Sequence, residues 1–133
     1  MEPLRKILHV EDDPDIRAIL KICLEDLGGF ELLQCSSGHE ALQAAAELDP
    51  DLCFLDMMMP GLNGLETLEA LRSLEGLNEI PAIFVTSVNN AEMYRDAILE
   101  QAIGSIQKPF DPSQIVQQLM KIWSDYQNAL NSN

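Results

Sequence analysis

The feature that most constrains the fold of this chain is a fivefold alternation of short apolar segments with longer amphipathic ones. The amphipathic segments repeat their apolar residues at helical spacing. Strands that alternate with helices predict an α/β fold, with right-handed crossovers and a parallel sheet that helices cover on both faces. The middle strands lack polar alternation, as a doubly covered sheet requires. The expected strands are residues 7–10, 30–35, 51–56, 81–86 and 103–106.

Start and stop signals set the expected helix limits. Asp13 is a predicted N-cap, with Pro14 at the first helical position, where its missing N–H is tolerated. Ser37 and Glu40 have the spacing of a capping box. The other expected limits are stops at Gly28-Gly29 and near residues 48–50, starts at Asn63-Gly64 and Asp111-Pro112, and a helix from about Asn90 to Glu100.

Length and composition favour one compact domain, which we expect at residues 1–127, followed by a polar C-terminal tail at 128–133 that frays. The formal charge of −14 argues against direct nucleic-acid binding, which needs clustered basic residues. Most of the acidic side chains are expected on solvated helix faces. The N-terminal segment resembles neither a signal peptide nor a membrane span. Cys23, Cys35 and Cys53 lie in apolar runs and fit buried free thiols, so a cytoplasmic location is expected.

Polar side chains stand at the carboxyl end of several expected strands. Asp56 is a lone acid that closes a buried strand, Glu11 and Asp12 follow the first strand, Thr86 ends the fourth and Lys108 follows the fifth. A charge at the end of a buried strand is unfavourable unless a partner stabilises it. In parallel sheets, ligands bind beyond the carboxyl ends of the strands. These residues are therefore expected to converge at one rim.

The residue types at this rim suit phosphate chemistry assisted by a metal ion. Converging carboxylates repel one another, and a bound Mg²⁺, which prefers oxygen ligands, removes that repulsion. Asp56 can serve as a metal ligand only, or as a nucleophile that forms an acyl phosphate. Lys108 offers a cation and Thr86 a hydroxyl, although an ordinary surface lysine and a turn residue are the simpler interpretations. Asp13 is interpreted only as a helix cap, and the Lys108-Pro109 bond can be cis or trans.

Two other residue types are given structural interpretations. His9 is expected in the core and His39 on the surface, because neither has a recognisable partner pattern. The run Met57-Met58-Met59 is attributed to packing and to the loop, since hard cations do not favour thioether ligands.

Four motifs in order carry a resemblance to a known family. They lie at residues 10–17, 56–64, 85–87 and 107–110, and the resemblance extends over about residues 5–123. Over that span the chain resembles the receiver domain of two-component response regulators. The resemblance implies a flavodoxin-like (βα)5 fold with strand order 2-1-3-4-5. It also implies a signalling switch in which Asp56 accepts a phosphoryl group from a sensor histidine kinase or phosphotransfer protein.

The same resemblance assigns roles at the rim. Asp12 would bind Mg²⁺ directly, Glu11 through water, and Met58 through its backbone carbonyl, with Asp56 as both ligand and acceptor. Thr86 and Lys108 would contact the phosphoryl group.

One position departs from the family pattern. An aromatic switch residue is expected three positions before Lys108, where this chain has Ser105. We therefore expect phosphorylation to be retained but the output face to respond differently. Met58 and Val88 flank the expected water path to the phosphoryl group, and their apolar character predicts slow self-dephosphorylation.

Two other functions stay open as alternatives. A haloacid-dehalogenase-like phosphatase also uses an aspartate nucleophile and Mg²⁺, but it needs a second aspartate where this chain has Met58. A pseudo-receiver that acts only as a protein-interaction scaffold is disfavoured by the intact acids, Thr86 and Lys108, whereas Ser105 leaves room for it. We expect a phosphoacceptor rather than an enzyme. Because no output domain follows Trp123, we expect either a stand-alone receiver or a domain excised from a longer protein. A monomer or weak dimer is expected, with an unidentified downstream protein target.

Overall fold

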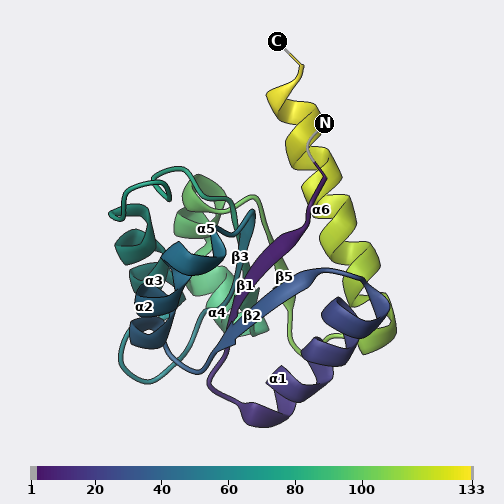
Figure 1. Cartoon of the computed structure of the whole chain (residues 1–133), viewed down its shortest axis with the longest axis horizontal. Coiled ribbons are helices and arrows are strands. Elements are labelled where there is room, and N and C mark those ends of the chain that lie inside the picture. Colours follow the sequence, from purple (N-terminus) through teal and green to yellow (C-terminus); the bar gives the residue numbers. More distant parts are fainter. Residues whose placement is uncertain (1–2, 133) are drawn as a thin grey trace.

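The fold is a parallel five-stranded sheet in the order β2-β1-β3-β4-β5 (Figure 1). The computed structural model describes residues 3–132. The doubly wound α/β fold and the strand order expected from the sequence are both confirmed. The strands are β1 (Lys6–Val10), β2 (Glu31–Cys35), β3 (Leu52–Asp56), β4 (Ala82–Thr86) and β5 (Gly104–Gln107).

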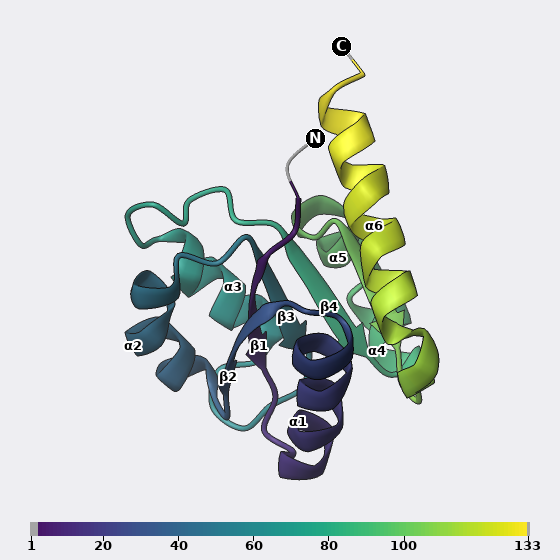
Figure 2. The same ribbon diagram turned by 45° about the vertical axis from the view of Figure 1, so that its right-hand side comes forward.

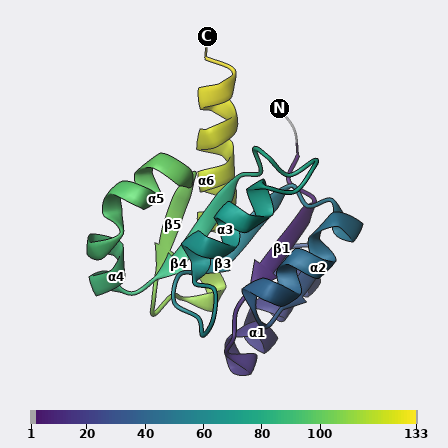
Figure 3. The ribbon, with the colours of Figure 1, turned by 90° about the vertical axis from the view of Figure 1, so that its left-hand side faces the viewer.

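Helices connect the strands and cover both faces of the sheet. Figure 3 shows α2 and α3 in front of the sheet and α6 behind it, and Figure 2 shows α6 on the same side as the first helix. The helices are α1 (Pro14–Lys21), η1 (Ile22–Leu27), α2 (Gly38–Leu48), α3 (Gly64–Arg72), α4 (Val88–Met93), α5 (Arg95–Gln101), η2 (Pro112–Gln114) and α6 (Ile115–Leu130).

The sheet separates two apolar cores. Successive strand residues point to opposite faces, so Phe54 packs on the α1 and α6 side while Leu55 packs on the α2 and α3 side. All five residues of β3 and of β4 are buried. This double coverage explains why the middle strands read as continuous apolar runs, and it makes the buried carboxylate of Asp56 exceptional.

The helix starts follow the predicted caps, with one exception. The Asp13 side chain accepts hydrogen bonds from the N–H groups of Asp15 and Ile16, as expected of an N-cap. Ser37 also caps α2, but its predicted capping box is wrong. The Glu40 carboxylate accepts a hydrogen bond from the Ser36 hydroxyl at 2.8 Å instead of from the backbone of Ser37. A complete capping box forms between Asn63 and Glu66 at the start of α3.

Two of the expected helices differ from the structure. The first ends at Gly28 as predicted, but its second half, η1, is a π-helix, in which the Gly28 N–H bonds to the Cys23 carbonyl five residues back. The helix expected from about Asn90 to Glu100 starts earlier, at Val88, and is interrupted at Tyr94, whose backbone (φ −104°, ψ 18°) is not helical. The last helix continues through Leu130, beyond the expected domain end at residue 127, and the fraying of the tail stays a prediction.

The expected burial of the histidines and cysteines is confirmed. His9 is buried and His39 is exposed. The thiols of Cys23, Cys35 and Cys53 are buried and free.

Candidate functional site

Asp56 ends the buried central strand β3 and is itself only 4 % exposed. The start of α3 packs directly against this strand end. The Gly64 N–H donates to the Met57 carbonyl at 2.8 Å, and a Cβ at Gly64 would lie 2.6 Å from the Asp56 carbonyl oxygen. Only glycine allows this close approach, so α3 helps to fix where the Asp56 side chain emerges.

Glu11 and Asp12 follow strand β1 and meet Asp56 at the same rim. One carboxylate oxygen from each of Glu11, Asp12 and Asp56 lies within 4.8 Å of the other two. Glu11 is 1 % exposed, and its Oε2 accepts a hydrogen bond from the Asp13 N–H at 3.2 Å, whereas Asp12 is exposed. The convergence expected from the sequence is therefore present for these three acids.

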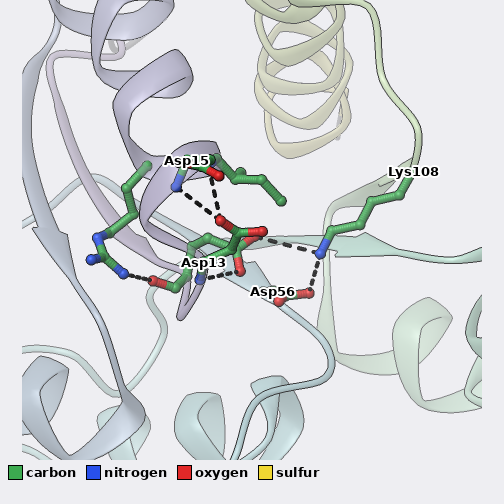
Figure 4. A network of polar contacts seen from close by, with 7 residues as sticks. Asp13, Asp15, Asp56 and Lys108 are labelled. Atoms are coloured by element: carbon green, nitrogen blue, oxygen red, sulfur yellow. Dashed lines mark hydrogen bonds and ion pairs between the residues drawn. The ribbon is translucent and has the colours of Figure 1, made fainter.

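Lys108 brings a cation to the same point from the far side of the site (Figure 4). Its Nζ lies 3.1 Å from Asp56 Oδ1 and 3.5 Å from Glu11 Oε1. The backbone N–H of Lys108 donates to the Thr86 carbonyl at 2.8 Å, which ties this residue to the end of β4. The Lys108-Pro109 peptide bond, left open by the sequence, is cis.

Burial and neighbouring charges shift the pKa of Glu11 and of Lys108. Burial and then the neighbouring Asp56 raise the pKa of Glu11 to about 8. Burial lowers the pKa of Lys108, but the attraction of Asp56 and Glu11 outweighs it, so the pKa is raised overall. The Lys108 ammonium contacts two of the three carboxylates, so the cluster, when fully ionised, keeps an excess of negative charge.

This donor set fits a hard divalent cation. Three carboxylates supply oxygen ligands, and their excess negative charge is neutralised by a charge of two. The acidic cluster, which includes the buried carboxylate of Asp56 and lies beside Lys108, can thus hold a metal ion, as the sequence led us to expect.

Thr86 and Met58 lie at the same rim, but neither contacts the acids through a hydrogen bond within residues 3–132. Thr86 is 1 % exposed, and its hydroxyl donates to the Ser87 carbonyl at 3.1 Å. The Met58 side chain is 50 % exposed. The metal-ligand role of the Met58 carbonyl stays a prediction.

Ser105 lies away from the acids, on strand β5. It is exposed, pairs in register with Phe84, and lines a groove of about 260 Å³ between β5 and α6. The place expected to hold an aromatic side chain is thus open to solvent.

A second set of polar residues supports the acids and was not predicted. Arg17 Nη1 donates to the Glu11 carbonyl at 2.7 Å, and Gln34 Nε2 donates to the Arg17 carbonyl at 2.8 Å. Gln34 Nε2 also lies 3.0 Å from His9 Nδ1. Burial, then Arg17 and Lys108, lower the pKa of His9 to about 3. Arg17 stands within a recognised motif, but Gln34 occupies an edge strand and carries no sequence signal of its role.

The chain belongs to the response regulator receiver domain family, whose match spans residues 7–120. Receiver domains are the signalling domains of two-component systems, and they interact with histidine kinases or phosphotransfer proteins. This membership establishes the class of protein that the motifs indicated, and it does not favour the phosphatase or scaffold alternatives.

Curated relatives of this chain are response regulators. The DNA-binding response regulator MtrA of Mycolicibacterium smegmatis is 35% identical over 120 residues, which are 87% of this chain and 50% of that protein. The probable C4-dicarboxylate response regulator DctR of Halalkalibacterium halodurans is 31% identical over 110 residues, which are 82% of this chain and 47% of that protein. The chain spans about half the length of the curated relatives it matches.

Solved structures give the same fold. The chemotaxis response regulator CheY4 of Vibrio cholerae has a TM-score of 0.80 and 28% identity, over 90% of this chain and 99% of that one. The receiver domain of NtrX from Brucella abortus has a TM-score of 0.75 and 30% identity, over 87% and 96%. Within residues 3–132, none of the helices has the length and apolar character needed to cross a membrane.

Proposed function

We propose that Asp56 is the residue of this receiver domain that accepts the phosphoryl group. The observation that carries the proposal is the contact of one buried carboxylate, Asp56, with the Lys108 ammonium 3.1 Å away, beside two further acids. The free Asp56 oxygen would attack the phosphorus atom of a phosphohistidine, and the P–N bond would break as the P–O bond forms. The leaving imidazole keeps the bonding electrons and takes up a proton.

Mg²⁺ is the proposed cation of the acidic cluster. Asp12 and Asp56 would bind it directly, the Met58 carbonyl would add a third ligand, and Glu11 would act through water. When bound, the ion neutralises charge on the transferring phosphoryl group. Lys108 supplies a fixed positive charge to one phosphoryl oxygen, and Thr86 would turn its hydroxyl from the Ser87 carbonyl towards another.

The remaining expectations are proposals that follow from the same site. A sensor histidine kinase or phosphotransfer protein donates the phosphoryl group, and an unidentified protein reads the result. We place the protein in the cytoplasm because its three cysteines are free thiols. We propose that the protein is a phosphoacceptor and not an enzyme. It neither contacts nucleic acid directly nor binds membranes, and it is a monomer or weak dimer.

Incubation with acetyl phosphate and Mg²⁺, followed by intact mass spectrometry, tests the proposal. The parent protein should gain the mass of one phosphoryl group, whereas Asp56→Asn should gain none. Omitting Mg²⁺ in the presence of a chelator should suppress the gain in the parent. A parent that gains no mass under any of these conditions would instead support a scaffold without phosphoacceptor activity.

A further inference from the structure

A chain of partly buried polar contacts runs from the edge strand β2 to the acidic loop after β1. Gln34 of β2 donates to the Arg17 carbonyl at 2.8 Å, and the Arg17 guanidinium folds back to the Glu11 carbonyl at 2.7 Å. His9, on β1 opposite Gln34, lies 3.0 Å from the same amide nitrogen. Because that nitrogen carries two hydrogens, it can donate to His9 Nδ1 and to the Arg17 carbonyl together. Gln34 therefore ties the first turns of α1 to both strands.

We infer that Arg17 is a positioning residue for the cation site, an inference that rests on the proposed function. The carbonyl that Arg17 holds belongs to the peptide group that joins Glu11 to Asp12. Because a peptide group is planar, fixing its oxygen also fixes the direction in which the chain enters Asp12. Arg17 would thereby set the place of the carboxylate that binds the cation directly, without itself touching the ion.

The surroundings of Asp12 show why a backbone anchor matters there. Glu11 is held by its buried side chain, through the Asp13 N–H and Lys108. The Asp12 carboxylate is exposed, and no group within residues 3–132 donates a hydrogen bond to it. Its position therefore depends on its backbone, and Arg17 supplies a hydrogen bond from a charged donor to that backbone.

The charge of Arg17 would act in the opposite direction. A cation near three carboxylates lowers their attraction for a second cation, so removal of Arg17 by charge alone should tighten Mg²⁺ binding. The positioning role predicts that removal weakens binding, because residues that orient metal ligands contribute to metal affinity. The sign of the change therefore separates the two effects.

The experiment is a calorimetric Mg²⁺ titration of metal-free protein, at a temperature where each variant is folded, with metal-free stability measured separately by urea unfolding. For Arg17→Met we expect Mg²⁺ affinity to fall about tenfold, the lower end of the range for residues that orient metal ligands. Arg17→Lys keeps a charged donor and should recover part of the loss. Gln34→Met leaves every charge in place and should weaken binding as well. Arg95→Met removes the same charge from the exposed surface of α5 and should leave the affinity unchanged.

Unchanged or tighter Mg²⁺ binding by Arg17→Met, with a loss of metal-free stability alone, would overturn the inference and make Arg17 an ordinary anchor of α1. If Arg17→Met does not fold, Gln34→Met decides by the same criterion. The parent titration comes first. If the parent protein binds no Mg²⁺, the proposed cation site itself is contradicted. If the parent binds Mg²⁺ and Arg17→Met binds it with the same affinity, only the role of Arg17 is contradicted.

Discussion

The Lys108 ammonium bridges Asp56 and Glu11, with Nζ 3.1 Å from Oδ1 of the first and 3.5 Å from Oε1 of the second. These carboxylates belong to different strand ends, so one flexible side chain joins β5 to both β1 and β3. A divalent cation and Lys108 compete for the negative charge of these carboxylates. Lys108 is also placed to stabilise a phosphoryl group on Asp56, and its two roles have opposite effects when it is removed.

Replacing Lys108 with methionine should slow phosphorylation by acetyl phosphate and tighten Mg²⁺ binding. The rate should fall by about 100-fold, as when one preorganised charge-stabilising group is lost. Mg²⁺ affinity should rise a few-fold, because the ion no longer shares the carboxylates with an ammonium group. Rates are measured by intact mass against time, and affinity by calorimetry.

Lys121→Met provides the matched control, because Lys121 is an exposed lysine of α6 that pairs with Asp125 at 3.2 Å. It should change neither quantity. Weaker Mg²⁺ binding in Lys108→Met would contradict the competition between the lysine and the metal ion.

The raised pKa of Glu11 predicts that the metal-free protein loses stability as the pH rises. A glutamate carboxyl ordinarily has a pKa of 4.5, whereas the pKa of Glu11 in the folded protein is about 8. Between these values the folded state holds a proton that the unfolded state has released, so stability falls with increasing pH. His9 has the opposite effect, because burial lowers its pKa from the ordinary histidine value of 6.5 to about 3, so stability is lost as the pH falls below 6.5.

Between pH 6.5 and about 8, the change in stability therefore reports the ionisation of Glu11 and not that of His9. Urea unfolding with a chelator present should show a loss of about 1–2 kcal/mol across this window, which Glu11→Gln should remove. Saturating Mg²⁺ should also reduce the loss, because the ion stabilises the ionised carboxylates. An equal slope in the parent and in Glu11→Gln would show that another group titrates.

The alternation of strands with helices was sufficient to predict a doubly wound parallel sheet and the convergence of the acids, whereas the strand order followed from the family resemblance. Parallel strands place all their carboxyl ends at one edge, so Glu11, Asp12 and Asp56 needed only correct strand limits to be brought together. Lys108 and Asp56 are far apart in the chain. The sequence motifs predict that both lie at the same edge of the sheet, but they do not predict the contact between the two side chains.

The parts that were wrong or missed depend on contacts without a local signal. The break at Tyr94 and the π-helical turns after Lys21 do not follow from helical periodicity, which continues through both. Ser36 competes with the Ser37 backbone for the Glu40 carboxylate, and spacing alone does not decide that competition. The role of Gln34 arises from the pairing of β2 with β1.

Phosphorylated protein should lose its phosphoryl group slowly, over minutes or longer in Mg²⁺ without a phosphatase. The side chains of Met58 and Val88 are 50 % and 61 % exposed, and neither can orient an attacking water by hydrogen bonding. Intact mass followed after removal of acetyl phosphate gives the lifetime. Met58→Asn should shorten the lifetime, and Met93→Asn, at an exposed methionine of α4, should not. A lifetime of seconds in the parent would contradict this prediction.

The response around Ser105 should differ from that of a receiver with an aromatic switch. Ser105 is an exposed residue of β5 with no ring to move inward, so a phosphate mimic should perturb the rim more than this strand. Amide shifts and hydrogen exchange with and without the mimic measure the response. A large rearrangement of the segment around Ser105 would contradict the prediction. The variant Ser105→Tyr provides the comparison with an aromatic side chain at this position.

The central claim is that the phosphoryl group is attached to Asp56, and fragment mass spectrometry tests it most directly. Protein treated with acetyl phosphate and Mg²⁺ is digested under acidic conditions, and the modified residue is located within its peptide. We predict an acyl phosphate on Asp56 that hydroxylamine removes. A hydroxylamine-resistant phosphate on Thr86 or Ser87, or an acyl phosphate on Asp12, would contradict the account.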